Sequence, residues 1–267
     1  MPELFFPQLT SGASAQYPIG KSRFIRTIQN VMADGSFYAK QDPGAGRLQW
    51  EFSYVDLSFV DITALQAHFD SCAGPVRGFT FIDPTDNMLA SSADFTNSAW
   101  KQMPIAGLIT LQPLAADPFG GNGAFTATNT SQVVQEITQE FTVPANCQYC
   151  LSVYARSQDL PSITLRRSGE VLSETTTYSV GPAWTRVVSR GRLNDAGTKL
   201  TVAIGLAPGQ ALLYGPQLEA QPAPSRYCST TNAGGVYPNA HWAVEELAIV
   251  AEAPNLYSVS FTIETAL

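Results

Sequence analysis

Residues 47–84 constrain the fold of this chain more than any other stretch. Between residues 48 and 54 apolar side chains alternate with polar ones, which predicts a half-buried strand. Residues 77–82 predict a second strand, which ends at a breaker-rich sequence. The run that could complete a sheet with these strands, residues 257–264, comes only after a long segment of different character. We therefore expect residues 47–84 to form part of a domain that is finished by the other end of the chain.

One helix is predicted between these two strands. Apolar residues recur at helical spacing from Ile62 to Cys72, so one face of the helix would pack on the sheet. Asp61 can cap the first turn, and a Gly-Pro pair stops the helix. Upstream, an Asp-Gly pair at residues 34–35 lies between two short apolar runs, which is typical of a hairpin turn.

Residues 87–231 have a different texture. Their β-like runs are short and are separated by turns rich in Pro, Gly and Asn. Only 14% of the whole chain is charged, which also favours an all-β module with many turns. The predicted strands are residues 124–128, 133–141, 149–155, 162–167, 176–180, 185–189, 199–206 and 211–218. Because no convincing helix interrupts them, these strands indicate a β-sandwich of the jelly-roll type.

Charge separates the same segment from its flanks. Residues 87–231 hold nine acidic and nine basic side chains, so the flanks carry the whole net charge of −7. The flanks together have an ordinary domain size, and exposed loops tolerate insertions well. We therefore predict a mainly β protein with a discontinuous hub domain. This domain is a sandwich or barrel with one α-helix and consists of residues 1–86 and 232–267. Residues 87–231 form an inserted jelly-roll domain.

Several functional classes find little support in the composition. An acidic chain lacks the clustered Lys and Arg of a nucleic-acid surface. The start of the sequence has no basic segment followed by an apolar one, and no apolar run is long enough for a membrane span. We expect a soluble product that is made in the cytoplasm without membrane insertion.

Catalytic motifs are also missing around the titratable residues. His68 falls on the predicted helix, and neither it nor His241 lies near a nucleophile motif. Cys147 and Cys150 have the spacing of a redox pair, but on a strand they would point to opposite faces. We therefore expect no enzymatic activity, no catalytic residue and no cofactor.

The flanks resemble phage distal tail or minor tail proteins of long-tailed, siphovirus-type phages. The resemblance rests on LQWEFSYVDLS at residues 48–58, AHFDSCAGP at 67–75, RGFTFIDPTDN at 77–87 and APNLYSVSFTIETA at 253–266. It implies a structural protein of the virion, at the distal end of the tail near the baseplate. It also implies a homo-oligomeric ring, expected to be a hexamer, that contacts the tail tube protein and the tail-tip hub protein.

The inserted segment resembles the carbohydrate-binding-like jelly-roll modules of phage tail and fibre proteins. The resemblance rests on NMLASSADFTNSAW at residues 87–100 and LLYGPQLEAQPAPSRYCSTT at residues 212–231. It implies the fold and the setting; neither the sugar nor whether any sugar is bound is implied. Our hypothesis is that the module projects outward and contacts host cell-surface glycans weakly, gaining strength from multiple copies.

Sugar binding usually needs exposed aromatic rings. The aromatic residues considered in the inserted segment are Trp100, Phe119, Tyr149, Tyr154, Tyr178, Trp184 and Tyr214. Core packing accounts best for rings at strand positions, whereas Phe119 lies in a Gly-rich loop. We select Phe119, Trp100, Trp184 and Tyr178 as candidate glycan-binding residues. Asp94 and Glu219 are candidate oxygen donors for a structural calcium ion, although no ligand spacing is diagnostic.

Two functions follow from these resemblances. The chain is either a ring-forming structural protein that joins tail tube to tail tip, or a receptor-binding adhesin whose jelly roll is the main working part. A glycan-degrading enzyme is a further rival, which a cleavage assay on surface polysaccharide would detect.

Overall fold

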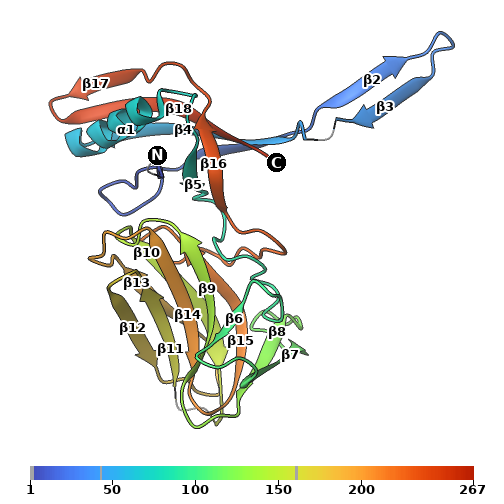
Figure 1. Cartoon of the computed structure of the whole chain (residues 1–267), viewed down its shortest axis with the longest axis vertical. Coiled ribbons are helices and arrows are strands. Elements are labelled where there is room, and N and C mark those ends of the chain that lie inside the picture. Colours follow the sequence, from blue (N-terminus) through green and yellow to red (C-terminus); the bar gives the residue numbers. More distant parts are fainter. Residues whose placement is uncertain (1–2, 43, 160–161) are drawn as a thin grey trace. The chain divides into compact units, whose positions relative to one another are not determined.

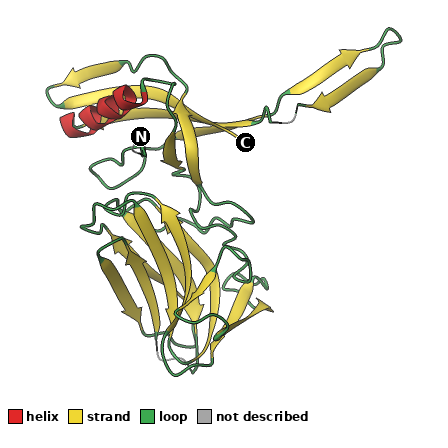
Figure 2. Ribbon diagram, viewed as in Figure 1, coloured by secondary structure: helices red, strands yellow, loops and turns green. Residues whose placement is uncertain are grey.

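The computed structural model describes residues 3–42, 44–159 and 162–267. It is mainly β, with one α-helix in the described part of the chain (Figures 1 and 2). The chain divides into two compact units. Unit 1 contains residues 1–81 and 237–267, and unit 2 contains the intervening residues 82–236. The helix of the described segments is neither long nor apolar enough to cross a membrane.

Unit 1 is built on a six-stranded sheet with the order β1-β4-β18-β16-β5, in which β17 also pairs with β18. Its strands are β1 (Ile19–Phe24), β4 (Arg47–Leu57), β5 (Phe79–Ile82), β16 (Val236–Trp242), β17 (Ile249–Ala253) and β18 (Leu256–Ala266). Strands β4 and β18 run antiparallel, with Phe52 opposite Phe261 and Trp50 opposite Ile263. This pairing confirms that the C-terminal run completes the sheet that residues 47–84 begin.

The helix α1 (Phe59–Cys72) follows β4 directly. Ser58, and not Asp61, is its N-terminal cap: the Ser58 hydroxyl accepts a hydrogen bond from the Asp61 N–H at 3.1 Å. The Asp61 carboxylate turns back and accepts hydrogen bonds from the Ser58 hydroxyl and from Thr10. Asp61 is thus the third residue of the helix, and the cap lies three residues before the one that the sequence pattern suggested. The helix ends at Ala73, which adopts a left-handed backbone with φ 51°.

The core of unit 1 consists largely of aromatic rings. The ring of Phe6 lies within 6.4 Å of the rings of Phe52, His68, Phe79, Phe81, Trp242 and Phe261, measured between centroids. Ile62 and Leu65 of the helix complete this core, as the helical periodicity predicted. His68 is also buried, and its Nδ1 accepts a hydrogen bond from Trp242 Nε1 at 3.2 Å.

A separate two-stranded sheet lies between β1 and β4 in the sequence (Figure 1). Strands β2 (Thr27–Val31) and β3 (Phe37–Gln41) pair antiparallel, and every residue of both strands is exposed. Gly35 occupies a left-handed conformation, φ 82°, in the turn, which confirms the hairpin predicted from the Asp-Gly pair.

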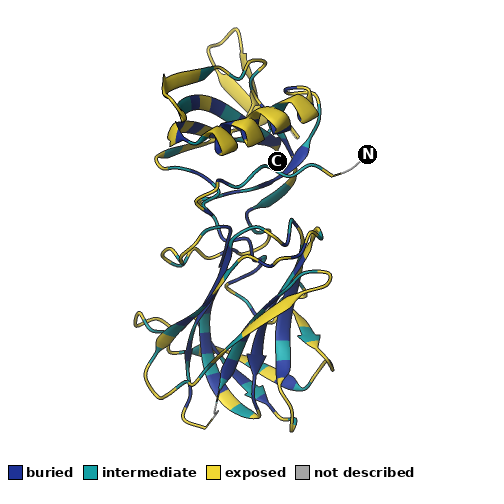
Figure 3. Cartoon of the chain, turned by 90° about the vertical axis from the view of Figure 1, so that its left-hand side faces the viewer, coloured by how far each residue is buried: buried dark blue, intermediate teal, exposed yellow. Residues whose placement is uncertain are grey.

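Unit 2 is a jelly-roll β-sandwich of two antiparallel five-stranded sheets. The front sheet has the order β13-β10-β15-β8-β7 and the back sheet the order β12-β11-β14-β9-β6. The strands are β6 (Lys101–Met103), β7 (Ile109–Ala115), β8 (Ala124–Asn129), β9 (Gln135–Thr142), β10 (Tyr149–Arg156), β11 (Ile163–Ser168), β12 (Ser173–Tyr178), β13 (Thr185–Gly191), β14 (Lys199–Leu206) and β15 (Gly209–Glu219). Buried residues lie along the strands of both sheets (Figure 3). The core that they form is mainly aliphatic.

The two ends of unit 2 lie side by side. The buried side chain of Asn87 donates hydrogen bonds to the carbonyls of Pro216 and Cys228 and accepts from the N–H of Leu218. Further along, the Ser91 N–H donates to the Asn232 carbonyl. A unit whose first and last segments meet in this way can be inserted into a loop of another domain without separating the two sides of that loop.

Candidate functional site

The outer face of the front sheet follows from the alternation along β10. Leu151, Val153 and Ala155 point into the buried core, so Tyr154 and Arg156 must point outward. The neighbouring strands follow the same rule and bring further side chains to this face. We call this outer surface of β13, β10 and β15 the front face.

Three aromatic rings meet on the front face. Tyr154 lies directly opposite Tyr214 in the pairing of β10 with β15, and their ring centroids are 6.1 Å apart. Phe119 comes from the loop between β7 and β8 and packs edge-on against both, at 5.5 Å from Tyr154 and 5.9 Å from Tyr214. Phe119 is nevertheless 69% exposed. These residues, Phe119, Tyr154 and Tyr214, are called the ring triad below.

Asp117 holds the loop that presents Phe119. Its carboxylate accepts hydrogen bonds from the N–H groups of Phe119, Gly121 and Gly123 at 2.8, 3.0 and 3.1 Å. Gly120 has a φ of +89°, a backbone conformation that a residue with a side chain rarely adopts. Desolvation acts to raise the pKa of Asp117, but the three N–H donors outweigh it and keep the pKa below the ordinary value.

Arg186 of β13 fixes the other side of the ring triad. Its guanidinium lies over the Tyr154 ring, with its central carbon 5.2 Å from the ring centroid. The same group donates to the Ser225 carbonyl at 2.5 Å and to the Ser152 hydroxyl at 3.0 Å. Arg186 therefore ties the ring triad to the segment that follows β15 and holds Tyr154 in place.

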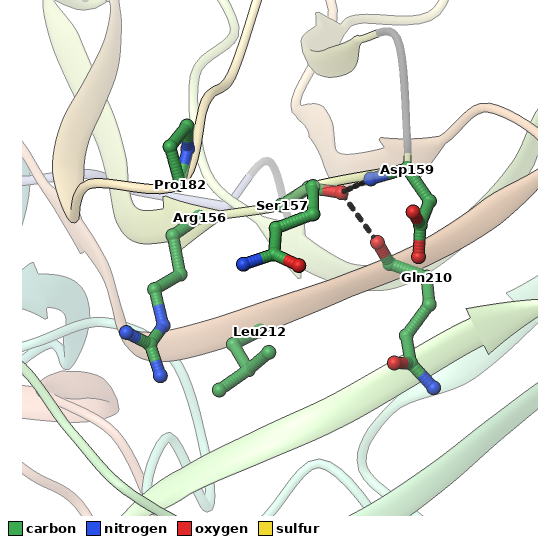
Figure 4. Close-up of a pocket in the computed structure, with 7 residues that line it drawn as sticks. Arg156, Ser157, Asp159, Pro182, Gln210 and Leu212 are labelled. Carbon is green, nitrogen blue, oxygen red and sulfur yellow. Dashed lines mark hydrogen bonds between the residues drawn. The ribbon is translucent and has the colours of Figure 1, made fainter.

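A pocket of about 180 Å³ opens at one end of the front face. It is lined by Arg156, Ser157, Gln158, Asp159, Pro182, Gln210 and Leu212 (Figure 4). The Ser157 hydroxyl fixes its wall by donating to the Gln210 carbonyl at 2.5 Å and accepting from the Asp159 N–H at 3.1 Å. The guanidinium of Arg156 lies over the ring of half-buried Trp184, 5.2 Å from its centroid.

The structure separates the four aromatic candidates chosen from the sequence. Phe119 and Trp184 both lie on the front face. Trp100 does not: it is only 8% exposed, packs on Phe95, and donates its indole N–H to the Ser91 carbonyl. Tyr178 belongs to the back sheet, packs against the core and donates its hydroxyl to the Val188 carbonyl. Trp100 and Tyr178 are therefore corrected to structural residues, because both rings serve the core.

The two candidate calcium ligands occupy local turns. The Asp94 carboxylate accepts hydrogen bonds from the N–H and hydroxyl of Thr96. Glu219 is buried, and its oxygens accept from Ser225 and Gln221. Within the described ranges, no group of three or more His, Cys, Asp or Glu residues is placed to hold a metal ion.

The residues weighed for catalysis are also dispersed. His68 lies in the core of unit 1, where burial lowers its pKa to about 4. Nδ1 of His241 lies 3.1 Å from the Pro75 carbonyl. In unit 2, Cys147 precedes β10 while Cys150 lies within it, and both are free thiols whose pKa values are raised by burial.

Sequence reasoning missed four members of the front face as site residues. Tyr154 and Tyr214 were considered but assigned to the core, and Arg156 and Arg186 were not considered. The signal that finds them is the strand alternation itself, since Tyr154 and Arg156 are out of phase with the core residues of β10.

No family model and no curated protein matches this chain. Solved structures similar to it include tailspike protein 4 of bacteriophage CBA120, at 12% identity and a TM-score of 0.41 over 52% of this chain. The match spans only 22% of the tailspike chain. The xylan-binding domain CBM22-1 of Paenibacillus barcinonensis Xyn10C is 14% identical, with a TM-score of 0.40 over 55% of this chain and 98% of its own. TmCBM61, solved with β-1,4-galactotriose, is 16% identical, with a TM-score of 0.37 over 49% and 97%. Similarity at this level carries no functional argument, so the function is inferred from the residues of this chain.

Proposed function

We propose that unit 2 binds glycans through its front face and that unit 1 anchors it in a phage tail. The observation that carries the proposal is the ring triad: three aromatic residues are gathered on one outer sheet face, and one of them is 69% exposed. A single exposed ring is ordinary, but rings gathered into one patch of the surface often mark a binding site. The apolar face of a pyranose ring is a suitable partner for such rings.

The surroundings of the ring triad suit a sugar better than a purely apolar ligand. Asp117 and Arg186 hold the rings in place, so little conformational entropy is lost when a ligand binds. Polar groups of the adjacent pocket, such as the Asp159 carboxylate, can accept hydrogen bonds from hydroxyl groups. The proposed activity is binding without catalysis, and incubation with host surface polysaccharide should release no fragments.

The setting is proposed from the flanks. Their resemblance to distal tail proteins supports a structural role at the distal end of a virion tail, between the tail tube protein and the tail-tip hub protein. Several copies in a ring would present several front faces to the cell surface. Individually weak contacts would then combine into firm attachment.

The hairpin β2–β3 favours self-assembly of unit 1. An isolated two-stranded sheet is only marginally stable in water. This one also exposes large apolar side chains, among them Ile28, Val31, Phe37 and Tyr38, each more than half exposed. Exposed apolar strands with open edges attract a partner. In a ring of identical subunits, that partner would be a neighbouring copy.

The glycan proposal is tested by removing the ring triad. The double variant Phe119→Ala/Tyr214→Ala should lose binding to host cell-surface polysaccharide while its thermal unfolding stays close to wild type. Phe59→Ala, which removes a ring that is 60% exposed on the helix of unit 1, is the matched control and should bind normally. Undiminished binding by the double variant would refute the proposed site.

The assembly proposal is tested by replacing residues 27–41 with a short Gly-Ser linker. The full-length protein should sediment as a ring, with a hexamer as the expected size, and the linker variant as a smaller species. The rival function, an adhesin whose jelly roll is the main working part, is examined by deleting residues 90–230. Particles that assemble normally but fail to adsorb would favour the adhesin, whereas loss of tails would favour a structural role for the insert.

A further inference from the structure

The cationic side chains of the two sheets of unit 2 differ in whether they form ion pairs. On the back sheet, Arg166, Arg167 and Lys199 each form an ion pair with a glutamate, at 2.5, 2.6 and 2.7 Å. These pairs neutralise the cations with carboxylates of the same chain. These three cations therefore need no anion from outside, whereas Lys101, on the short edge strand β6, forms no ion pair within the described residues.

The front face carries three arginines, Arg156, Arg186 and Arg190, and none of them forms an ion pair among the residues described. Arg186 and Arg190 instead donate to the carbonyls of Ser225 and Pro222, which holds the segment after β15. Arg156 has no hydrogen-bond acceptor in the described part of the protein, and its described interaction is the contact with the Trp184 ring. The front face thus keeps one guanidinium whose donors are available.

The position of Arg156 makes this available guanidinium a binding group. It lies on the wall of the 180 Å³ pocket, and its guanidinium carbon lies over the Trp184 ring, a contact that helps to hold the group in position. Figure 4 shows Asp159 on the opposite side of the pocket from Arg156. The pocket therefore offers donors at one side and an anionic acceptor at the other.

We propose that this pocket receives the carboxylate of an acidic sugar residue, of the uronic acid class, in a glycan whose neighbouring residue stacks on the ring triad. The inference rests on the proposed glycan-binding function. A carboxylate is planar and matches the paired donors of a guanidinium. The hydroxyl groups of the same sugar can donate to Asp159.

The charges of the site favour a carboxylate over a phosphate ester. Arg156 supplies one positive charge, which the single negative charge of a carboxylate matches, whereas the second charge of a phosphate monoester would be repelled by Asp159 across the pocket. Arg156 also lies two residues beyond Tyr154 on β10, which places it roughly 7 Å along the strand. One chain of sugar residues can therefore contact the ring triad and Arg156 together.

The test uses the full-length protein on a glycan array that contains uronic-acid oligosaccharides, their carboxyl-reduced neutral counterparts, and phosphate-bearing and sulfated glycans. Wild type should prefer the uronic members over their reduced partners. Arg156→Gln should weaken binding to the uronic members by about 10- to 100-fold and leave binding to the reduced ones unchanged. Lys101→Gln removes one positive charge from the back sheet and should change neither. Thermal unfolding of each variant checks the fold.

The outcomes distinguish failure of the acidic-sugar proposal from failure of the glycan-binding function on which it rests. Equal binding of the uronic and reduced members, or a preference for the reduced ones, overturns the acidic ligand and leaves glycan binding intact. Arg156-dependent binding of phosphate or sulfate esters, with no binding of uronic members, overturns the carboxylate assignment. Binding to no glycan at all overturns both the acidic ligand and the glycan-binding function.

Discussion

The two units of this protein place their aromatic rings in opposite ways. In unit 1 the rings fill the core, where Phe52, Trp242 and Phe261 are at most 3% exposed. In unit 2 most of the core is aliphatic, and a second set of rings, the ring triad, is held on the outer face of a sheet. An aromatic residue at an alternating strand position can thus serve packing or recognition. Its phase relative to the other core residues of its strand decides which.

The largest expected effect of this difference is on stability. Phe261→Ala should lower the free energy of unfolding of unit 1 by about 3–5 kcal/mol, because it removes a buried ring that packs on Phe6, Phe52, Tyr54 and Trp242. Phe119→Ala in unit 2 should change stability by less than about 0.5 kcal/mol, because that ring is mostly in water already. Urea denaturation of both variants measures the contrast.

In a binding assay the variant that is less destabilised should show the larger loss. Phe119→Ala should lose glycan affinity, while Phe261→Ala should retain it at temperatures where unit 2 is folded. If Phe119→Ala were as destabilising as Phe261→Ala, the ring triad would be part of a core and the division between packing and recognition would fail.

Much of the architecture could be predicted from periodicity. The alternation in residues 48–54 and 257–264 located two strands that pair across the whole insertion, and the Asp-Gly pair located the hairpin. Two strands of unit 2 were missed. β6 is only three residues long, and β7 contains Pro113 and an irregularity next to Leu114, whose φ is +70°, so neither shows a clean alternation.

The candidate site was predicted only in part, and the reason is physical. Phe119 was selected because it lies in a Gly-rich loop, where a ring is more often exposed than at a strand position, and Trp184 was selected as an aromatic residue beside a strand; the structure places both on the front face. Trp100 was misassigned because its burial depends on contacts with Phe95 and Ser91 that local sequence does not encode. The proximity of Tyr154 to Tyr214 depends on the register of β10 with β15, which only the folded sheet fixes.

The next largest expected effect is a pH dependence of stability, due to His68, that unit 1 has and unit 2 lacks. His68 is buried among the rings of unit 1, and burial lowers its pKa from 6.5 to about 4. The unfolded chain therefore takes up a proton as the pH falls below about 6.5, whereas the folded unit does so only near pH 4. Stability should be unaffected by His68 above this range and should decline between pH 6.5 and 4, by about 3 kcal/mol at most.

This decline should be confined to unit 1. Urea midpoints measured at intervals from pH 7 to 4 should fall less steeply in His68→Gln, since glutamine does not titrate and can still accept from Trp242 Nε1. The variant retains every carboxylate, so the difference between the two curves isolates the imidazole. Identical pH dependence in both proteins would mean that the pKa of His68 is the same in the folded and the unfolded chain.

The smallest effect concerns how the ring triad is held. Asp117→Ala removes the acceptor of three loop N–H groups, so Phe119 has to be ordered again when a ligand binds. Ordering costs roughly 1 kcal/mol, which is about a fivefold loss of glycan affinity, and the amides of Phe119, Gly121 and Gly123 should exchange with solvent faster. Asp94→Ala is the matched control, because Asp94 accepts from Thr96 in a comparable turn away from the ring triad. If both variants lost affinity equally, the loss would reflect general loosening of unit 2; a loss confined to Asp117→Ala would show that unit 2 presents its rings on a fixed loop, as unit 1 fixes its own by burial.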